Sequence, residues 1–498
     1  MKYIFLGTFL LLVVASLGTY WSQPDLKSSK PVLYWVTDAN PARKLQIDLF
    51  HQWLARHRDQ GYPDFELRVD SANRDGPKRI IQGVSGVGGD IMDLNASELP
   101  YMQNIGLFED VTAEAKRLGF SPDKTYPATG EMLWYKEKQY AFPCNVTLAC
   151  FFVNVETFKK YGIAEPPEEW TFDQFEKTGT EFVTKANPPG ELRKVFFVDM
   201  IEPLILLRSV GLDPFNETMT RYQLDDPRGA EVYTRLNHWR NDLHLLPTRD
   251  DIASFSSSSG YGGQGPQLFY HGNYGLMWSF GRYFLIQFRL FDEERRARGE
   301  QPMEMSTALP PCQEFTNTTT GARVAGVYRG SQHKDLAVYF LAFLASEDYN
   351  MQIVRDADGL PPNPEFTRGD EYNKPADFPT EWKIHEPENR LHEKYSISES
   401  FSPFLLKKTQ TDRETTYAEF IEGGSKTPAE ATKELTIRLN DELLRNLDEN
   451  PKLKPEYERL CAQQKEIESL RAAGRKVPLK LITNPFYRRY YVSKGWAE

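Results

Sequence analysis

The stretch that decides the fold is Lys136–Asn154, which reads KEKQYAFPCNVTLACFFVN. Its last eleven residues, Cys144–Asn154, carry no formal charge and are rich in Val, Thr, Cys and Phe, which is typical of a strand buried on both faces. Pro143 precedes them, and a proline belongs at a strand end, an edge or a crossing between sheets because it cannot donate to a β ladder. The stretch therefore predicts a strand through which the chain leaves one domain and enters another. An ordinary core strand that begins with a proline is the alternative.

The residues that follow predict a helix, a turn and a second helix. Residues 154–162 are typical of a short helix that ends on Gly162. Two prolines and a tryptophan occupy residues 166–170, and Thr171 is the expected N-cap of an amphipathic helix. This order of hinge strand, asparagine, helix, glycine, Pro-Pro, tryptophan and helix closely resembles the extracellular solute-binding proteins of ABC importers, and more specifically their sugar-binding, maltose-binding-protein-like branch.

The resemblance covers roughly residues 31–450. It implies an α/β chain with the two-lobed periplasmic-binding-protein fold, in which each lobe is a mixed open sheet flanked by helices and hinge strands join the lobes. Met305–Cys312, which contains Ala-Leu-Pro, resembles the family's second hinge strand. We expect lobe 1 at residues 31–143 plus about 309–345, lobe 2 at residues 144–308 plus about 346–450, and a C-terminal extension at residues 451–498.

Two of the four cysteines occupy matching places in the predicted hinge strands. Cys144 and Cys312 each follow a proline, and the two hinge strands should lie side by side. A disulfide between them is therefore a hypothesis, which requires their Cα atoms to lie within roughly 7 Å. Four cysteines are few for an exported chain, and the absence of a Cys-x-x-Cys motif or a His/Cys cluster predicts no metal site.

Length and composition limit the possible classes of protein. A chain of 498 residues is too long for one average domain, so two domains plus further segments are expected. Hydrophobic residues at 40% and aromatic residues at 13% suffice for two cores. The net charge of −10 argues against a nucleic acid or an anionic membrane surface as a partner.

The beginning of the chain predicts export. Met1 and Lys2 are followed by the apolar segment Tyr3–Trp21, so residues 1–21 are expected to be a signal peptide or an N-terminal anchor. Residues 22–30 form a polar linker. We expect a periplasmic protein or one at the outer face of the cytoplasmic membrane, and the sequence leaves open whether the N-terminal segment is cleaved.

Polar residues follow two predicted strands near the start of lobe 1. Strand and helix patterns alternate there, which implies parallel βαβ units, and ligands bind beyond the carboxyl ends of the strands of such sheets. Thr37 and Asp38 follow one strand, and Asp93, Asn95 and Ser97 follow another. We predict that these side chains bind the ligand. The alternative is that Asp38, Asn95 and Ser97 only cap the next helices.

A second group of candidates lies on lobe 2. Residues 268–283 resemble a family element in which a strand runs to a glycine and an aromatic residue then faces the ligand. That match puts Tyr283 at the aromatic position with Trp278 and Arg282 beside it; Trp278 and Tyr283 could instead belong to the core. Arg282 would favour an acidic or phosphorylated ligand. The full set of predicted ligand-binding residues is Thr37, Asp38, Asp93, Asn95, Ser97, Asn145, Thr147, Trp278, Arg282 and Tyr283.

Motifs of catalysis are missing. The sequence contains no nucleophile elbow, HExxH motif, P-loop or dinucleotide fingerprint, so we expect no catalytic residue, cofactor or metal. The resemblance implies non-catalytic capture of a small polar solute, such as a sugar, by a monomer whose hinged cleft closes on the ligand and delivers it to an ABC-type permease. A secreted carbohydrate-active enzyme and a receptor that presents its ligand to a sensor protein are the alternatives. Met200 and Glu202 stand where maltose-binding relatives carry an aromatic platform, which argues against an oligosaccharide.

Overall fold

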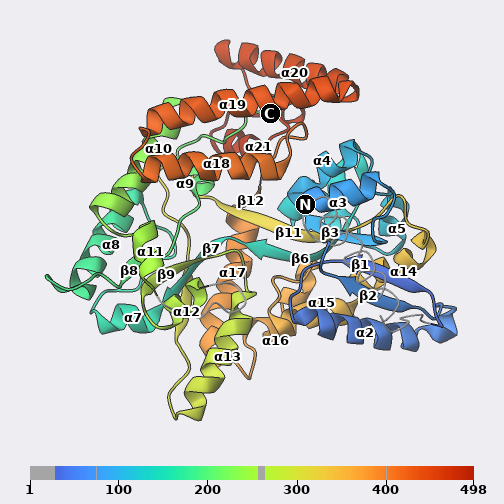
Figure 1. The fold of residues 1–498 in the computed structure, drawn as a ribbon, viewed down its shortest axis with the longest axis horizontal. Coiled ribbons are helices and arrows are strands. Elements are labelled where there is room, and N and C mark those ends of the chain that lie inside the picture. Colours follow the sequence, from blue (N-terminus) through green and yellow to red (C-terminus); the bar gives the residue numbers. More distant parts are fainter. Residues whose placement is uncertain (1–28, 74–75, 256–263, 400) are drawn as a thin grey trace, which may run out of the picture.

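The computed structural model describes residues 29–73, 76–255, 264–399 and 401–498. The predicted signal segment 1–21 and most of the linker 22–30 lie outside the described residues. Two sheets with their covering helices form two lobes, which lie side by side in Figure 1. In the described part of the chain, no helix combines the length and the apolar character needed to cross a membrane.

The first lobe is built on a mixed sheet with the strand order β12-β11-β3-β1-β2, and β6 joins it by pairing with β11. β1 runs parallel to β2 and β3, as the alternating strand and helix patterns predict, whereas β11 runs antiparallel to β3 and β6. The strands are β1 (Val32–Val36), β2 (Glu66–Asp70), β3 (Ile91–Asn95), β6 (Phe142–Leu148), β11 (Thr318–Val327) and β12 (Ser396–Ser398).

Neighbouring residues of these strands point alternately to two hydrophobic cores, one on each face of the sheet. Trp35 and Ile91 pack on one face with α2 and α14, and Val36 and Met92 pack on the other face with α4 and α6. The helices of this lobe are α2 (Ala42–Arg56), α3 (Gly76–Val84), α4 (Leu99–Asn104), α5 (Thr112–Arg117), α6 (Pro127–Leu133), α14 (Lys334–Leu344) and α15 (Glu347–Asp356). A hairpin of β4 (Trp134–Tyr135) and β5 (Lys138–Gln139) precedes β6.

The second lobe is built on a four-stranded sheet with the order β10-β7-β9-β8. Its strands are β7 (Cys150–Asn154), β8 (Phe196–Val198), β9 (Tyr274–Ser279) and β10 (Met305–Ala308). The helices after β7 are α7 (Val155–Lys160), α8 (Phe172–Ala186), α9 (Pro203–Ser209), α10 (Pro227–Asn237), α11 (Arg249–Ser254), α12 (Gly265–Tyr270) and α13 (Phe284–Ala297). The predicted N-cap of α8 is confirmed: Thr171 Oγ1 accepts from the Gln174 amide, and the Gln174 side chain accepts from the Thr171 amide.

The chain passes between the two sheets at the predicted places. β6 ends at Leu148 in the first sheet and β7 begins at Cys150 in the second sheet, so only Ala149 separates them. Pro143 lies in β6 next to a register shift in its pairing with β11, where the ladder tolerates a residue without an amide proton. β10 pairs with β7, and the chain then returns through residues 309–317 to β11 of the first sheet. The prediction of hinge strands between two lobes is confirmed.

The hypothesis of a hinge disulfide is wrong. All four cysteines lie in the described residues and are free thiols. Cys144 is buried in the first lobe, where its Sγ lies 3.9 Å from an Asp93 carboxylate oxygen. Cys312 lies past the end of β10 and pairs through its backbone with Trp170 of the second lobe. The two thiols are separate because β6 continues within the first sheet after Cys144.

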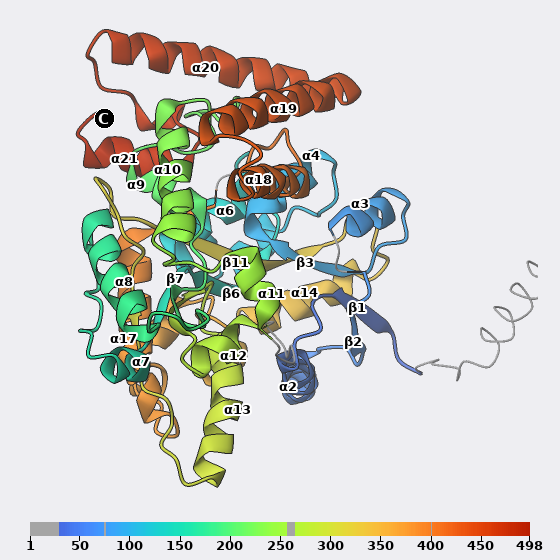
Figure 2. The same cartoon turned by 60° about the vertical axis from the view of Figure 1, so that its left-hand side comes forward.

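The chain that follows β12 adds helices at one end of the molecule (Figure 1). α16 (Asp370–Asn373) and α17 (Trp382–Tyr395) lead into β12, after which α18 (Lys407–Glu422) and α19 (Pro428–Glu449) join the core of the second lobe. Figure 2 shows α18 and α19 stacked with α20 (Lys454–Ala472), which belongs to the C-terminal extension together with α21 (Pro485–Ser493). The boundaries of the lobes stay a prediction. Tyr349 and Ile353 of α15 pack in the first-lobe core, which favours a boundary later than residue 345.

Candidate functional site

A polar cavity of about 280 Å³ opens at the carboxyl ends of β1 and β3, beside the hinge strand β6 and its partner β11. This is the position that the sheet topology predicts for a ligand. Six of the ten predicted residues line it, namely Thr37, Asp38, Asp93, Asn95, Asn145 and Thr147. The cavity therefore gathers residues from β3, β6 and β11 and from the segment after β1, which the sequence places far apart.

Asp93 organises the floor of this cavity. Its carboxylate accepts hydrogen bonds from Thr37 Oγ1, Trp35 Nε1 and Arg323 Nη1, each over 2.6 Å. Asp93 is almost fully buried in β3, so these three donors replace the water that the charge would otherwise bind. The result is a fixed array of polar groups around one carboxylate.

Two arginines hold the other carboxylates of the site in place. Arg43 Nε donates to Asp38 Oδ1 over 2.7 Å, and Arg43 Nη1 donates to Asp358 Oδ2 over 2.8 Å. Burial raises the pKa of Asp38, but the charges of Arg43 and Arg323 outweigh burial and hold that pKa below its ordinary value. Asp38 is therefore ionised at neutral pH and accepts hydrogen bonds only.

Arg323 is a lining residue that sequence reasoning missed. Its Nη1 donates to Asp93, and its Nη2 lies 3.4 Å from Asp358 Oδ2. Arg323 and Arg43 stack over the Trp35 ring, each at 5.8 Å from its centroid. The signal was present, because Arg323 is the single charged residue of the strand β11. Arg79 of α3 also lines the cavity and was missed.

Ser97 lies just outside this cavity, in a second polar cluster. Its hydroxyl contacts Asn95 Oδ1 at 2.7 Å and Glu399 Oε2 at 3.2 Å. Glu399 also accepts from Lys407 Nζ over 2.8 Å. Asn95 caps the short turn at Ala96, as the alternative interpretation held, and it also lines the cavity. Capping and a place in the site are therefore compatible at this residue.

A second cavity of about 390 Å³ lies on the second lobe between α9 and α18. Met200, Glu202, Glu399 and Lys407 are among its lining residues. Burial, followed by the charge of Glu399, raises the pKa of Glu202 to about 8, so this carboxyl is protonated at neutral pH and can donate a hydrogen bond. Asn95 Nδ2, which lines the first cavity, lies 3.4 Å from Glu399 Oε2, which lines the second cavity.

The remaining predicted residues lie elsewhere. Trp278 of β9 packs edge-on against Phe151 in the second-lobe core, which agrees with the core alternative. Arg282 is buried and donates to the carbonyls of Val354 and Gly359 over 3.3 Å each. Tyr283 packs against Phe284 at the start of α13. Arg282 was predicted to face the ligand but lies in the interior. The backbone at Gly281 explains this, because its φ of +124° turns the chain so that Arg282 enters the interior.

The family model described as bacterial extracellular solute-binding protein matches residues 59–351. This chain belongs to that family. The match includes β2 and β3 of the first lobe, both hinge strands and the sheet of the second lobe. β1 lies before the matched residues. The protein is therefore an exported, non-catalytic solute-binding protein, as the sequence predicted.

Solved structures share the two-lobed fold of this solute-binding protein. The ABC substrate-binding protein Lmo0181 from Listeria monocytogenes in complex with cycloalternan is 18% identical, and the match covers 82% of this chain and 98% of that chain with a TM-score of 0.66. A solute binding protein from Thermotoga lettingae bound with alpha-D-tagatose is 15% identical, and the match covers 83% of this chain and 100% of that chain with a TM-score of 0.64. Maltose-bound MalE3 from T. maritima is 16% identical, and the match covers 82% of this chain and 98% of that chain with a TM-score of 0.64. These likenesses confirm the predicted fold.

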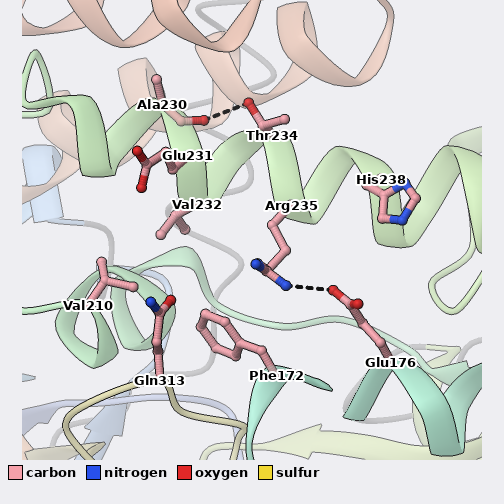
Figure 3. Close-up of a pocket in the computed structure, with 10 residues that line it drawn as sticks. All are labelled: Phe172, Glu176, Val210, Ala230, Glu231, Val232, Thr234, Arg235, His238 and Gln313. Atoms are coloured by element: carbon pink, nitrogen blue, oxygen red, sulfur yellow. Dashed lines mark hydrogen bonds and ion pairs between the residues drawn. The ribbon is translucent and has the colours of Figure 1, made fainter. Parts of the chain in front are cut away.

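Figure 3 shows a further cavity of the solute-binding protein, of about 560 Å³, between α8 and α10 of the second lobe. Arg235 Nη1 donates to Glu176 Oε1 over 2.7 Å, and the Arg235 guanidinium stacks over Phe172 at 5.0 Å. Trp239 Nε1 donates to the same glutamate oxygen over 2.7 Å. These polar groups bond to one another on a helical surface, and this cavity shares no lining residue with the cavity at the ends of β1 and β3.

Proposed function

We propose that this protein captures a small polar solute, namely a sugar, between its two lobes and delivers it to an ABC-type permease. The observation that carries the proposal is the polar cavity at the carboxyl ends of β1 and β3, which adjoins the strands that cross between the lobes. A ligand bound there contacts the hinge directly. The family membership supports the general activity, and the sugar is the specific proposal.

The chemistry of the cavity suits hydroxyl groups. Asp38 accepts hydrogen bonds, Arg323 donates them, and Thr37 carries a hydroxyl that can do either. Opposite charges stand side by side in the lining, so the site has little net charge and does not require a charged ligand. The three solved relatives named above are complexes with cycloalternan, tagatose and maltose, which supports a carbohydrate.

The proposed contact set joins the two cavities. In the first lobe it comprises Thr37, Asp38, Arg79, Asp93, Asn95, Asn145, Thr147 and Arg323. From the second cavity it comprises Glu202 and Lys407 of the second lobe and Glu399, which directly follows β12 of the first sheet. A ligand that contacts both groups stabilises the closed arrangement, because only that arrangement supplies both sets of contacts at once. Closure then follows from ligand binding without any chemical step.

The partners follow from this proposal. The closed, loaded protein docks on the permease, and we propose that it does so as a monomer. The acidic balance, with a net charge of −10, supports the expectation that nucleic acid is not a partner. We propose the periplasm or the outer face of the cytoplasmic membrane as the location, consistent with the extracellular family.

Calorimetric titration and thermal-shift measurements with monosaccharides, oligosaccharides, polyols and sugar phosphates test the proposal. We expect at least one neutral sugar to bind, and we expect Asp38→Asn to weaken that binding at least tenfold. Asp48→Asn is the matched control, because Asp48 is exposed on α2 outside the cavity. Failure of every sugar to bind would overturn the sugar assignment, and equal binding by Asp38→Asn and Asp48→Asn would overturn the site.

A further inference from the structure

The C-terminal extension, residues 451–498, packs on the segments that connect the two lobes. Figure 1 shows its last helix, α21, beside β12 and beneath α19. Hydrophobic residues of the extension form one core with Phe315 of the return crossing and with Ile397 of β12. The resemblance to solute-binding proteins ends before this segment, so its role must be inferred from its contacts.

The extension is anchored to a loop of the second lobe. The amides of Thr483 and Asn484 both donate to the Glu217 carbonyl over 2.9 Å. Asn484 Nδ2 donates to Asp213 Oδ1 over 2.9 Å, and Arg471 Nη1 donates to the Glu217 carboxylate over 2.8 Å. Most of these groups are buried, so the start of α21 has a fixed position relative to the second lobe.

Helix α21 and the residue that follows it also contact the return crossing, residues 309–317. Phe315 packs edge-on against Phe486 at 5.7 Å and against Tyr490 at 5.4 Å. Tyr490 OH donates to Glu314 Oε1 over 2.9 Å, and Lys494 Nζ lies 3.2 Å from the other oxygen of that carboxylate. This crossing is therefore held to α21 by both packing and hydrogen bonds.

α21 also contacts a third connection between the lobes, in addition to β6–β7 and β10–β11, at the point where α17 runs into β12. Arg489 Nη2 donates to the Lys394 carbonyl over 2.7 Å, and Arg489 Nη1 donates to the Ser396 carbonyl. Ile397 is almost fully buried in the core that Phe486 contributes to. β12 pairs with β11 of the first sheet, so these contacts connect α21 to the first lobe. One helix thus contacts the second lobe and two of the connections to the first lobe.

We infer that the C-terminal extension is a brace that restrains the motion of the two lobes about their hinge. Opening and closing require the connecting segments to change shape between the lobes. Contacts from a rigid helix to two of those segments and to the second lobe oppose such changes. The brace narrows the range of distances between the lobes, with or without a bound solute.

Spin-label distance measurements on the full chain test this inference. Labels are placed at Lys44→Cys on α2 and Thr184→Cys on α8, with Cys312 and Cys461 replaced by serine. The test variant combines Arg489→Gln with Tyr490→Phe, which removes the hydrogen bonds of the Arg489 guanidinium and the Tyr490 hydroxyl to the crossings. It keeps the aromatic ring at position 490 and the contact of Lys494 with Glu314. Arg475→Gln is the matched control, because Arg475 is an exposed arginine of the extension.

We expect the test variant to show a broader distribution of distances between the labels than the control, without any ligand added. A distribution equal to or narrower than that of the control would overturn the brace. If the double variant does not fold, the same comparison is made with Tyr490→Phe alone, for which the same two outcomes decide. The measurement uses no solute, so its result does not depend on whether the protein captures a sugar.

Discussion

Arg282 Nε lies 4.0 Å from Glu388 Oε2, and both side chains are buried where the second lobe meets α17. The Arg282 guanidinium also stacks over the Tyr372 ring at 4.4 Å. Burial raises the pKa of Glu388 to about 8, and the charge of Arg282 lowers it only in part. Glu388 is therefore protonated in the folded protein at neutral pH.

This raised pKa predicts how stability changes with pH. An unfolded glutamate loses its proton near pH 4.3, so between about pH 4.3 and 8 the folded state binds one proton more than the unfolded state. The contribution of Glu388 to stability is complete below that window and is lost as the pH rises through it. Glu388→Gln removes this titration. We therefore expect the free energy of unfolding of the variant, relative to that of the unaltered chain, to rise by at least about 1 kcal/mol from pH 5 to pH 8.

Urea unfolding at pH 5, 7 and 9 measures this difference. Glu365→Gln is the control, because Glu365 is exposed and should shift the curve by the same amount at each pH. The prediction would be contradicted if the free energies of unfolding of Glu388→Gln and of the unaltered chain differed by the same amount at all three pH values.

Asp93 should matter for stability as well as for binding. Asp93→Asn weakens the acceptor for three donors, among them Trp35 Nε1 and Arg323 Nη1. We expect a loss of about 1–3 kcal/mol in the free energy of unfolding, measured by urea denaturation. Trp35 fluorescence should change in the folded variant because its indole loses a charged partner. A loss no larger than that of Asp48→Asn would show that the network carries no stability.

The N-cap of α8 should have a measurable effect. Thr171→Ala removes the side-chain acceptor for the Gln174 amide and should destabilise the protein by about 1 kcal/mol. Thr171→Ser keeps the hydroxyl and should restore most of the loss. Thr180→Ala, an exposed change in the middle of the same helix, is the control for general effects of the substitution. Equal unfolding energies for Thr171→Ala and Thr171→Ser would contradict the capping role.

The thiols should differ in reactivity. Cys144 and Cys150 are completely buried, and burial raises the pKa of both thiols. We therefore expect a thiol reagent at pH 8 to modify Cys312 and Cys461 first in the native protein, and the two buried residues only on unfolding. Denatured, unreduced protein should release four thiols. A count of two would contradict the assignment of four free thiols.

Sequence reasoning named six of the residues that line the first-lobe cavity because their positions follow a local rule. Side chains that follow parallel strands meet at one edge of the sheet, so Thr37, Asp93 and Asn95 could be named from the ends of apolar runs. The second-lobe candidates could not be located in this way. Arg282 follows a strand as well, but the backbone at Gly281 turns it into the interior.

The sequence by itself determined the hinge strand within Lys136–Asn154 and the cap at Thr171, because proline, capping and apolar patterns act within a few residues. The two-lobed fold was implied by the resemblance of this stretch and the residues after it to solute-binding proteins. Only the tertiary structure decided that Arg323 joins Asp93, that Glu399 reaches Asn95, and that α21 lies across the crossings. Those contacts join residues far apart in the chain. They depend on how complete elements pack, and no short pattern in the sequence contains that information.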